Sequence, residues 1–240
     1  MKVHLFVPCL VDQAAPLTAH ATVRLLEKRG YEVVFDRRQT CCGQALYNAG
    51  FRPEARALAE RFISIFASAQ IVVSPSGSCV SMVVNHYADL GLTGSLVDDY
   101  NYLKTRVFEL AQFLALPTTP QAEFPRFPHS VVYHPSCHLT RDLGVITQPL
   151  DLIAQVPEIR LGNEDLPVEC CGFGGAFSVK YGGLSRRIAD RRAIALTATG
   201  AEYVCGGDDS CLGNLKQAFS RIGSPMKTIH YARILAGEES

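Results

Sequence analysis

Cys41-Cys42-Gly43 and Cys170-Cys171-Gly172 are two copies of one tripeptide, 129 positions apart. Each copy lies between two single cysteines at similar distances. The flanking cysteines are Cys9 and Cys79 in the first half, and Cys137 and Cys211 in the second. The segments between them contain 31 and 36 residues in the first half, and 32 and 39 in the second. This repeat indicates an internal duplication, with four cysteines in matching positions of each half.

The composition is that of a globular protein without a charge bias. Of the 240 residues, 48% are hydrophobic and 19% are charged, and 23 basic residues balance 23 acidic ones. A net charge of zero gives no global field that attracts nucleic acid or an anionic membrane. One basic cluster, Arg186, Arg187, Arg191 and Arg192, is predicted to form a solvated helix face. The sequence therefore predicts no nucleic-acid partner.

The chain contains no sequence signal for a membrane or for secretion. No stretch reaches the 18 or so apolar residues that a transmembrane helix requires. Residues 1–8 are too short and too soon interrupted by proline to be a signal-peptide core, and they are typical of a first strand. We therefore expect a cytoplasmic protein. There, nine cysteines indicate metal or redox chemistry in preference to a disulfide framework.

Strand and helix patterns alternate along both halves. Short apolar runs at 2–7, 31–35 and 71–73 are typical of buried strands, and residues 107–114 have helical spacing. The second half repeats this order. We expect an α/β fold of two similar Rossmann-like halves with mainly parallel sheets. The predicted domains are residues 1–116 and 129–240, joined by a proline-rich linker at 117–128.

The cysteines fall where such a fold places its sites. Cys9, Cys79 and Cys137 each follow a predicted strand, and ligands of open α/β sheets bind beyond the carboxyl ends of the strands. Adjacent cysteines have Cα atoms about 3.8 Å apart, which is too close for an unstrained disulfide. A glycine after them allows close backbone approach or a positive φ. We therefore expect each set of four cysteines to converge on a metal.

Two kinds of metal centre suit four thiolates. One is an iron–sulfur cluster and the other is a four-coordinate zinc ion. Structural zinc sites commonly use CxxC pairs, which neither half contains, so the spacing favours up to two [4Fe-4S] clusters with zinc as the alternative. The ninth cysteine, Cys205, aligns with Val73 and is predicted to be a core residue.

Four other residues are candidates for hydrogen-bonding a metal-bound sulfur. They are Ser76, Asp208, His134 and His138. Ser76 and Asp208 lie three residues before the last cysteine of their half, where a turn or helix-cap role is the alternative. The two histidines flank Cys137, where packing or exposure is the alternative.

The duplicated arrangement resembles the cysteine-rich CCG domain family over nearly the whole chain. This family includes the cysteine-rich component of heterodisulfide reductase and iron–sulfur subunits of systems that oxidise 2-hydroxy acids. The segments 6–12, 40–44, 75–80 and 170–181 are most similar to its lactate utilization branch. The resemblance implies eight ligands, namely Cys9, Cys41, Cys42, Cys79, Cys137, Cys170, Cys171 and Cys211.

For function, the resemblance implies an iron–sulfur electron-transfer subunit of a cytoplasmic complex that oxidises L-lactate, or a related 2-hydroxy acid, to the 2-oxo acid. It also implies two partners in the lactate utilization complex, a ferredoxin-like iron–sulfur protein and a third protein. No flavin or nicotinamide site is evident, so the oxidoreductase activity would be shared with a partner. One alternative is a thiol/disulfide redox protein, although the CxxC of heterodisulfide reductase is replaced here at Ser76 and Asp208. The other is a structural-zinc scaffold.

Overall fold

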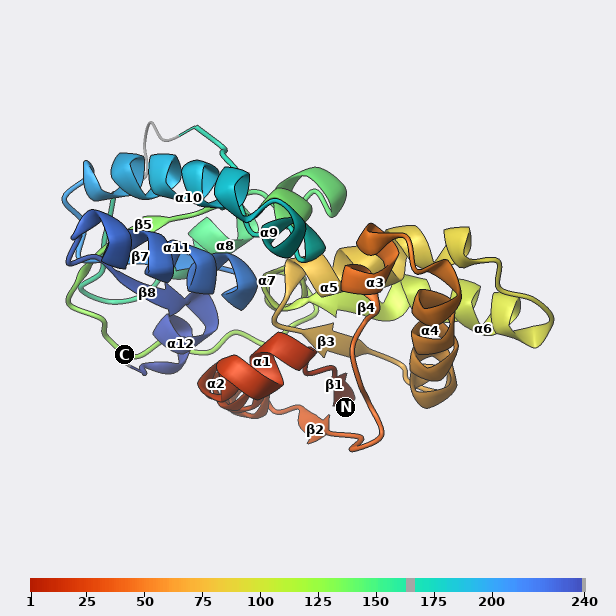
Figure 1. Cartoon of the computed structure of the whole chain (residues 1–240). Coiled ribbons are helices and arrows are strands. Elements are labelled where there is room, and N and C mark those ends of the chain that lie inside the picture. Colours follow the sequence, from red (N-terminus) through yellow and green to blue (C-terminus); the bar gives the residue numbers. More distant parts are fainter. Residues whose placement is uncertain (163–166, 239–240) are drawn as a thin grey trace. The chain divides into compact units, whose positions relative to one another are not determined.

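The computed structural model describes residues 1–162 and 167–238. The chain divides into two compact units, Met1–Ala122 and Glu123–Ser240. Each unit contains one four-stranded sheet in which every strand pair is parallel, with helices on both faces (Figure 1). The predicted fold class, two Rossmann-like halves with parallel sheets, is confirmed.

The first unit has the strand order β2-β1-β3-β4. Its strands are β1 (Lys2–Leu5), β2 (Glu32–Val34), β3 (Val72–Ser74) and β4 (Val107–Glu109). Its α-helices are α1 (Cys9–Ala14), α2 (Pro16–Lys28), α3 (Gln44–Ala49), α4 (Arg52–Phe66), α5 (Gly77–Ser81), α6 (Ser95–Leu103) and α7 (Leu110–Leu114). A π-helical turn, η1 (Met82–His86), follows α5, and the short 3₁₀ turns η2 (Tyr87–Leu90) and η3 (Lys104–Arg106) flank α6.

The second unit repeats this topology with the order β6-β5-β7-β8. Its strands are β5 (Ser130–Tyr133), β6 (Arg160–Leu161), β7 (Tyr203–Gly206) and β8 (Lys227–His230). Its helices are the π-helical turn η4 (His138–Asp142), α8 (Gln148–Ile153), α9 (Ala176–Lys180), α10 (Gly182–Thr197), α11 (Asp209–Ile222) and α12 (Tyr231–Ala236).

The direction in which the chain moves across each sheet reverses once. In the first unit, α1 and α2 connect β1 outward to β2, and α3 and α4 then carry the chain back past β1 to β3. With right-handed crossovers, this reversal puts successive helices on opposite faces. The neighbouring strands β1 and β3 therefore flank a topological switch point, the place where open α/β sheets bind ligands. Strands β5 and β7 flank the same point in the second unit.

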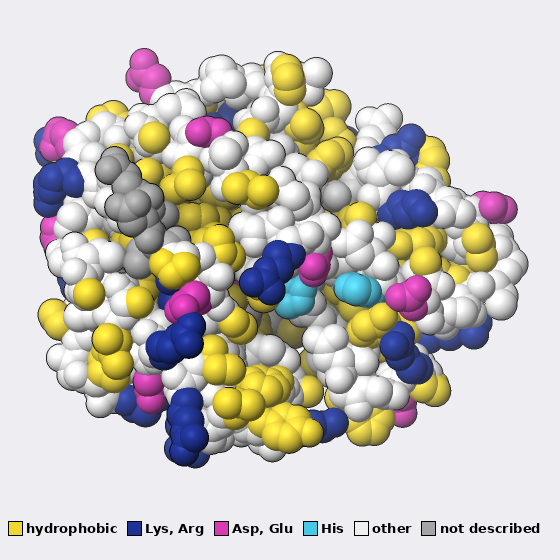
Figure 2. Space-filling model, turned by 90° about the horizontal axis from the view of Figure 1, so that it is seen from above, with side chains coloured by type: hydrophobic (Ala, Val, Ile, Leu, Met, Phe, Trp, Pro, Cys, Tyr) yellow, Lys and Arg dark blue, Asp and Glu magenta, His cyan; other side chains and the backbone are white. Residues whose placement is uncertain are grey.

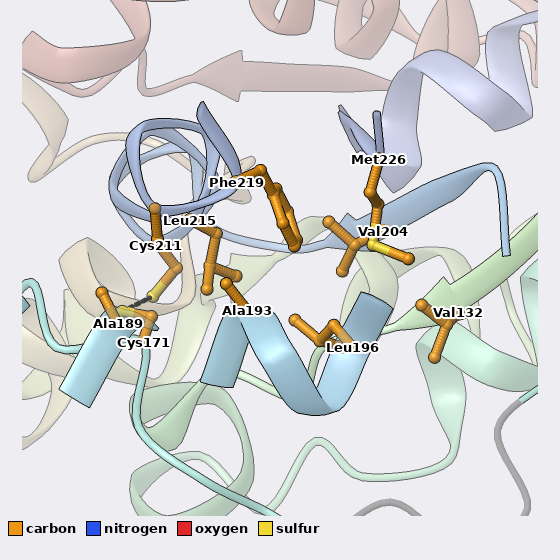
Figure 3. Close-up of a cluster of buried hydrophobic side chains, with 11 residues drawn as sticks. Val132, Cys171, Ala189, Ala193, Leu196, Val204, Cys211, Leu215, Phe219 and Met226 are labelled. Carbon is orange, nitrogen blue, oxygen red and sulfur yellow. Dashed lines mark hydrogen bonds between the residues drawn. The ribbon is translucent and has the colours of Figure 1, made fainter. Parts of the chain in front are cut away.

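The helices bury apolar stripes against the sheets. Helix α4 buries Ala55, Ala59, Phe62, Ile63 and Phe66, which recur at the spacing of one helix face. In the second unit, α10 and α11 pack against each other, and α11 packs on β7 and β8. Figure 3 shows side chains of this cluster, with the sulfurs of two cysteines at one end. The metal-site cysteines therefore lie at the margin of a packed core.

Two sequence-based expectations were wrong in detail. Residues 107–114 are not one helix, because Val107–Glu109 forms the edge strand β4 before α7 begins at Leu110. The cluster of four arginines is not a wholly solvated face either. Arg192 is fully buried, since it falls on the same stripe of α10 as Ala189 and Leu196. A buried guanidinium needs hydrogen-bond partners, and those of Arg192 lie near the second cysteine set.

The surface carries charges of both signs. On the face drawn in Figure 2, basic and acidic side chains are scattered among hydrophobic and neutral ones, as the balanced charge of the sequence predicts. In the part of the chain that the structure describes, no helix combines the length and the apolar character needed to cross a bilayer.

Candidate metal centres

Both cysteine sets lie at the switch points of the two sheets. Cys9 begins α1, just after β1, and Cys79 lies in α5, just after β3. The vicinal pair Cys41-Cys42 comes from the loop between β2 and α3. In the second unit, Cys137 follows β5 and Cys211 lies in the first turn of α11, after β7. Parallel strands thus bring together cysteines that are far apart in the sequence.

The four thiols of the first set form one connected chain. The Sγ atoms of Cys9 and Cys41 are 3.5 Å apart, and further hydrogen bonds link Cys41 to Cys42 and Cys42 to Cys79. Cys9 is exposed and Cys41 is half-buried, whereas Cys42 and Cys79 are buried. The set therefore has a solvent side and a core side.

The second set has the same connectivity. Hydrogen bonds link Cys137 to Cys170 and Cys170 to Cys171, and the Sγ atoms of Cys171 and Cys211 are 2.8 Å apart. Figure 3 shows the last two side chains pointing toward each other. Cys170 is exposed and Cys171 and Cys211 are buried, so this set too has a solvent side and a core side. All nine cysteines of the chain are free thiols.

The glycine of each tripeptide turns the backbone so that it contacts a sulfur. Gly43 has φ +87° and Gly172 has φ +81°, a region that favours glycine. The Gly43 N–H donates to Cys41 Sγ at 3.4 Å, and the Gly172 N–H donates to Cys170 Sγ at 3.2 Å. These N–H groups stabilise a thiolate at the first cysteine of each vicinal pair. Cys-Cys-Gly is therefore a structural unit as well as a source of ligands.

Polar side chains that the sequence analysis did not single out hold the second cysteine of each pair. The Tyr87 hydroxyl donates to the Cys42 carbonyl at 3.0 Å, and Asn214 Nδ2 donates to the Cys171 carbonyl at 2.8 Å. Neither residue carries a motif, so only its position on a helix that faces the loop marks it. Both contacts fix the main chain from which the buried thiols project.

The pKa values within each set diverge because neighbouring thiols share protons. Hydrogen bonds from Cys42 and Cys9 lower the pKa of Cys41 to about 3, and hydrogen bonds from Cys137 and Cys171 lower that of Cys170 to about 2. The pKa of Cys9 rises, chiefly because its thiol donates to Cys41. The metal-free sets therefore combine a thiolate with protonated thiols, and a metal must displace protons when it binds.

A difference in thiol reactivity follows. In metal-free native protein, we expect iodoacetamide to modify Cys170 at a rate almost independent of pH between about pH 5 and 8, because its lowered pKa keeps it a thiolate throughout. Cys205 is fully buried, and burial raises its pKa, so it should react only after unfolding. Peptide mass spectrometry at several pH values measures both rates. Labelling of native Cys205 as fast as Cys170 would contradict this prediction, and the burial of Cys205 itself is as predicted.

Ser76 and Asp208 occupy N-cap positions next to the last cysteines. Ser76 precedes α5, and its hydroxyl accepts from the Cys79 N–H at 3.4 Å. Asp208 precedes α11, and it accepts from the Ser136 hydroxyl at 3.2 Å. Both side chains are buried, so each orders the turn that presents its cysteine.

The two histidines beside Cys137 have different surroundings. His138 is partly exposed, and its Nδ1 lies 3.7 Å from Cys137 Sγ. His134 is fully buried, and its Nδ1 accepts from Arg192 Nε at 3.2 Å. A ring nitrogen of His134 and the Sγ atoms of Cys171 and Cys211 all lie within 4.8 Å of one another. Burial, with the charge of Arg192, lowers the pKa of His134 to about 3.

A pocket of about 600 Å³ opens beside the exposed Cys170. Its lining includes the side chains of Arg141, Arg187 and Arg191, together with Glu169. Glu169 forms an ion pair with Arg191. The solvent side of the second set therefore faces a predominantly basic cavity.

The donor groups present fit a metal centre. Each set offers four thiols at equivalent positions, and each is half shielded from water. Thiolates are the ligands that iron–sulfur clusters and structural zinc prefer. The sets also lie where related sheets bind their ligands.

Comparisons with known proteins agree with this geometry. The family model described as "Cysteine-rich domain", CCG, matches the chain twice, at residues 3–84 and 131–216. The chain belongs to the CCG cysteine-rich domain family. Each matched segment contains all four cysteines of its half, so the family pattern covers both candidate metal sites.

CCG relatives match over the full length of the chain. Lactate utilization protein A of Halalkalibacterium halodurans is 39% identical, with 100% of this chain and 98% of the relative covered. Lactate utilization protein A of Geobacillus thermodenitrificans is 37% identical, with 98% of each chain covered. The protein of the same name from Macrococcus caseolyticus is 37% identical, with 98% of this chain and 96% of the relative covered. The matches therefore extend across both halves of the duplication.

Proposed function

We propose that this CCG protein is an iron–sulfur electron-transfer subunit of a cytoplasmic complex that oxidises L-lactate, or a related 2-hydroxy acid, to the 2-oxo acid. The observation that carries the proposal is the presence of two four-thiol sets at equivalent switch points. The full-length relatives named lactate utilization protein A support the choice of substrate. A ferredoxin-like iron–sulfur protein and a third protein of the same complex are the proposed partners.

Cys9, Cys41, Cys42 and Cys79 would hold one metal centre, and Cys137, Cys170, Cys171 and Cys211 the other. An iron–sulfur cluster supplies one-electron redox chemistry when bound. Oxidation of L-lactate to pyruvate releases two electrons and two protons, so a partner must carry out the substrate step and pass on the electrons. The described residues of this chain bind the centres, shield their inner sides and leave an outer side open to a redox partner.

Two other functions have a specific observation in their favour. The exposed Cys170, with its lowered pKa and the basic pocket beside it, suits a thiol/disulfide redox protein that acts on an anionic disulfide. The 3.5 Å between the sulfurs of Cys9 and Cys41 is close to the spacing of about 3.8 Å that a tetrahedral zinc with Zn–S of about 2.3 Å imposes.

Anaerobic purification followed by iron, sulfide and zinc quantification separates these functions. We expect iron and sulfide for up to two four-iron clusters per chain, and a visible absorbance that L-lactate bleaches only when the proposed partner proteins are present. Stoichiometric zinc without iron would overturn the proposal in favour of a scaffold. Turnover of a low-molecular-weight disulfide by the isolated protein, without any response to lactate, would favour the thiol/disulfide function.

A further inference from the structure

The two metal sites differ at one pair of buried positions. Leu5 pairs with Val73 in the first sheet as Tyr133 pairs with Cys205 in the second, so the next residues, Phe6 and His134, are equivalent. Their N–H groups make the same hydrogen bond, to the carbonyls of Val73 and Cys205 respectively. Each lies three residues before the first cysteine of its set. The first set thus has a phenylalanine where the second has a histidine.

The neighbours of these residues on the long helices also correspond. A side chain on Gly43 would meet Ala55 and Leu58 of α4, and one on Gly172 would meet Ser185 and Ile188 of α10. This correspondence makes Arg192 the equivalent of Phe62, four residues beyond Leu58 and Ile188. The rings of Phe6 and Phe62 pack edge to face with centroids 4.9 Å apart. His134 and Arg192 occupy the same two places, joined by a hydrogen bond.

The contact with Arg192 determines which nitrogen of His134 carries the proton. A guanidinium only donates, so Nδ1 accepts and the proton of the neutral ring is on Nε2. In the described part of the chain, Nε2 is buried without a hydrogen-bond partner. A protonated Nε2 cannot ligate a metal, although it can donate to a sulfur. Ligation through Nε2 would need a proton on Nδ1, which the Arg192 Nε–H opposes.

We propose that His134, held by Arg192, donates an Nε2–H···S hydrogen bond to the metal-bound sulfur of Cys171 or Cys211 and raises the reduction potential of the second centre above that of the first. The Sγ atoms of both cysteines lie within 4.8 Å of a ring nitrogen, so a small adjustment on metal binding completes the contact. Hydrogen bonds to sulfur stabilise the more negative, reduced state of a cluster, and a nearby guanidinium acts in the same direction. The Phe6–Phe62 pair provides neither effect. His134 is a positioning residue here, and the inference rests on the proposed iron–sulfur occupancy.

Redox titration of anaerobically prepared protein, followed by electron paramagnetic resonance, tests the proposal. Cys41→Ser/Cys42→Ser protein isolates the second centre, and Cys170→Ser/Cys171→Ser protein isolates the first. In the former background, we expect His134→Phe to keep iron and sulfide but shift the potential to a lower value. His134→Gln, which retains an N–H donor, should recover part of the shift. In the latter background, His134→Phe should leave the potential of the first centre unchanged.

Two further measurements guard against a merely structural effect. The double variant His134→Phe/Arg192→Phe reproduces the Phe6–Phe62 pair and should fold even if the single variant packs poorly. Its second centre should also have a lowered potential. Nitrogen hyperfine coupling in ¹⁵N-histidine-labelled protein should be weak, as for a hydrogen-bonded ring, and should disappear in His134→Phe protein.

An unchanged potential in both phenylalanine variants with full iron content overturns the inference, and so does a strong coupling of the kind that an iron-bound nitrogen gives. Either result leaves the proposed function intact, because iron and sulfide are still present. Absence of iron from the unsubstituted protein overturns both, so failure of the inference and failure of the proposed function give different results.

Discussion

Replacing Gly172 with alanine is expected to lower the free energy of unfolding by about 2–5 kcal/mol. A non-glycine residue in the left-handed region costs about 1–2 kcal/mol, and forcing atoms into a packed site adds about 1–3 kcal/mol. Both apply here, because φ is +81° and the new Cβ would lie 2.6 Å from the Ser185 carbonyl oxygen and 3.1 Å from the Ala189 nitrogen. These are backbone atoms of α10, which cannot move aside locally.

Urea denaturation of anaerobically prepared protein measures this effect, and two glycines separate its causes. Gly200 has φ +71° with nothing within 4 Å of a new Cβ, so Gly200→Ala should show the conformational cost alone. Gly43 has a nearest contact of 3.3 Å, to the Ala55 carbonyl oxygen, and Gly43→Ala should fall between the two. A Gly172→Ala protein no less stable than Gly200→Ala protein would refute the predicted clash.

Loss of one centre is the second large expected effect. Cys170→Ser/Cys171→Ser protein should lose the metal of the second set and retain that of the first, so that total metal falls by about half. A serine hydroxyl is a poor substitute for a thiolate at a soft metal site, and these two residues supply half of the four donors. Cys41→Ser/Cys42→Ser protein should show the complementary loss. Iron, sulfide and zinc quantification, with electron paramagnetic resonance, measures both.

The ninth cysteine provides the matched control. Cys205 occupies the position of Val73 in the other sheet, so Cys205→Val introduces a side chain that this place in the fold already accepts. This variant should retain the metal of both sets. Loss of metal from Cys205→Val protein, or retention of all metal by Cys170→Ser/Cys171→Ser protein, would contradict the assignment of eight ligands.

The sequence is sufficient to predict the fold class, because apolar strand-length runs and helical stripes alternate in both halves. It also places Cys9 and Cys79 near each other, since each follows a strand and the carboxyl ends of parallel strands meet at one edge. That all eight are metal ligands stays a prediction. A short strand was harder to identify. Val107–Glu109 is three residues long, and its residues continue into the apolar spacing of α7, so local periodicity alone suggests one helix.

The contrast between the two sites could not be predicted from residue types. Arg192 stands among three other arginines, and charge clusters on helices are usually solvated. Its burial follows from its phase on α10, where it shares a face with Ala189 and Leu196. The partner of Arg192, His134, is 58 positions away in the sequence, and only the sheet and helix packing bring the two together. Tertiary contacts of this kind leave no local pattern.

The partial burial of each thiol set imposes an order on assembly and damage. Cys9 and Cys170 are exposed, while Cys42, Cys79, Cys171 and Cys211 are buried. A metal donor must therefore approach from the outer cysteines, and the inner sulfurs complete the coordination after they lose their protons. Oxygen and peroxide arrive by the same route, so the outer cysteines are the first to be oxidised. Repair of a damaged centre then needs only the reduction of accessible thiols, because the inner pair stays protected by the core.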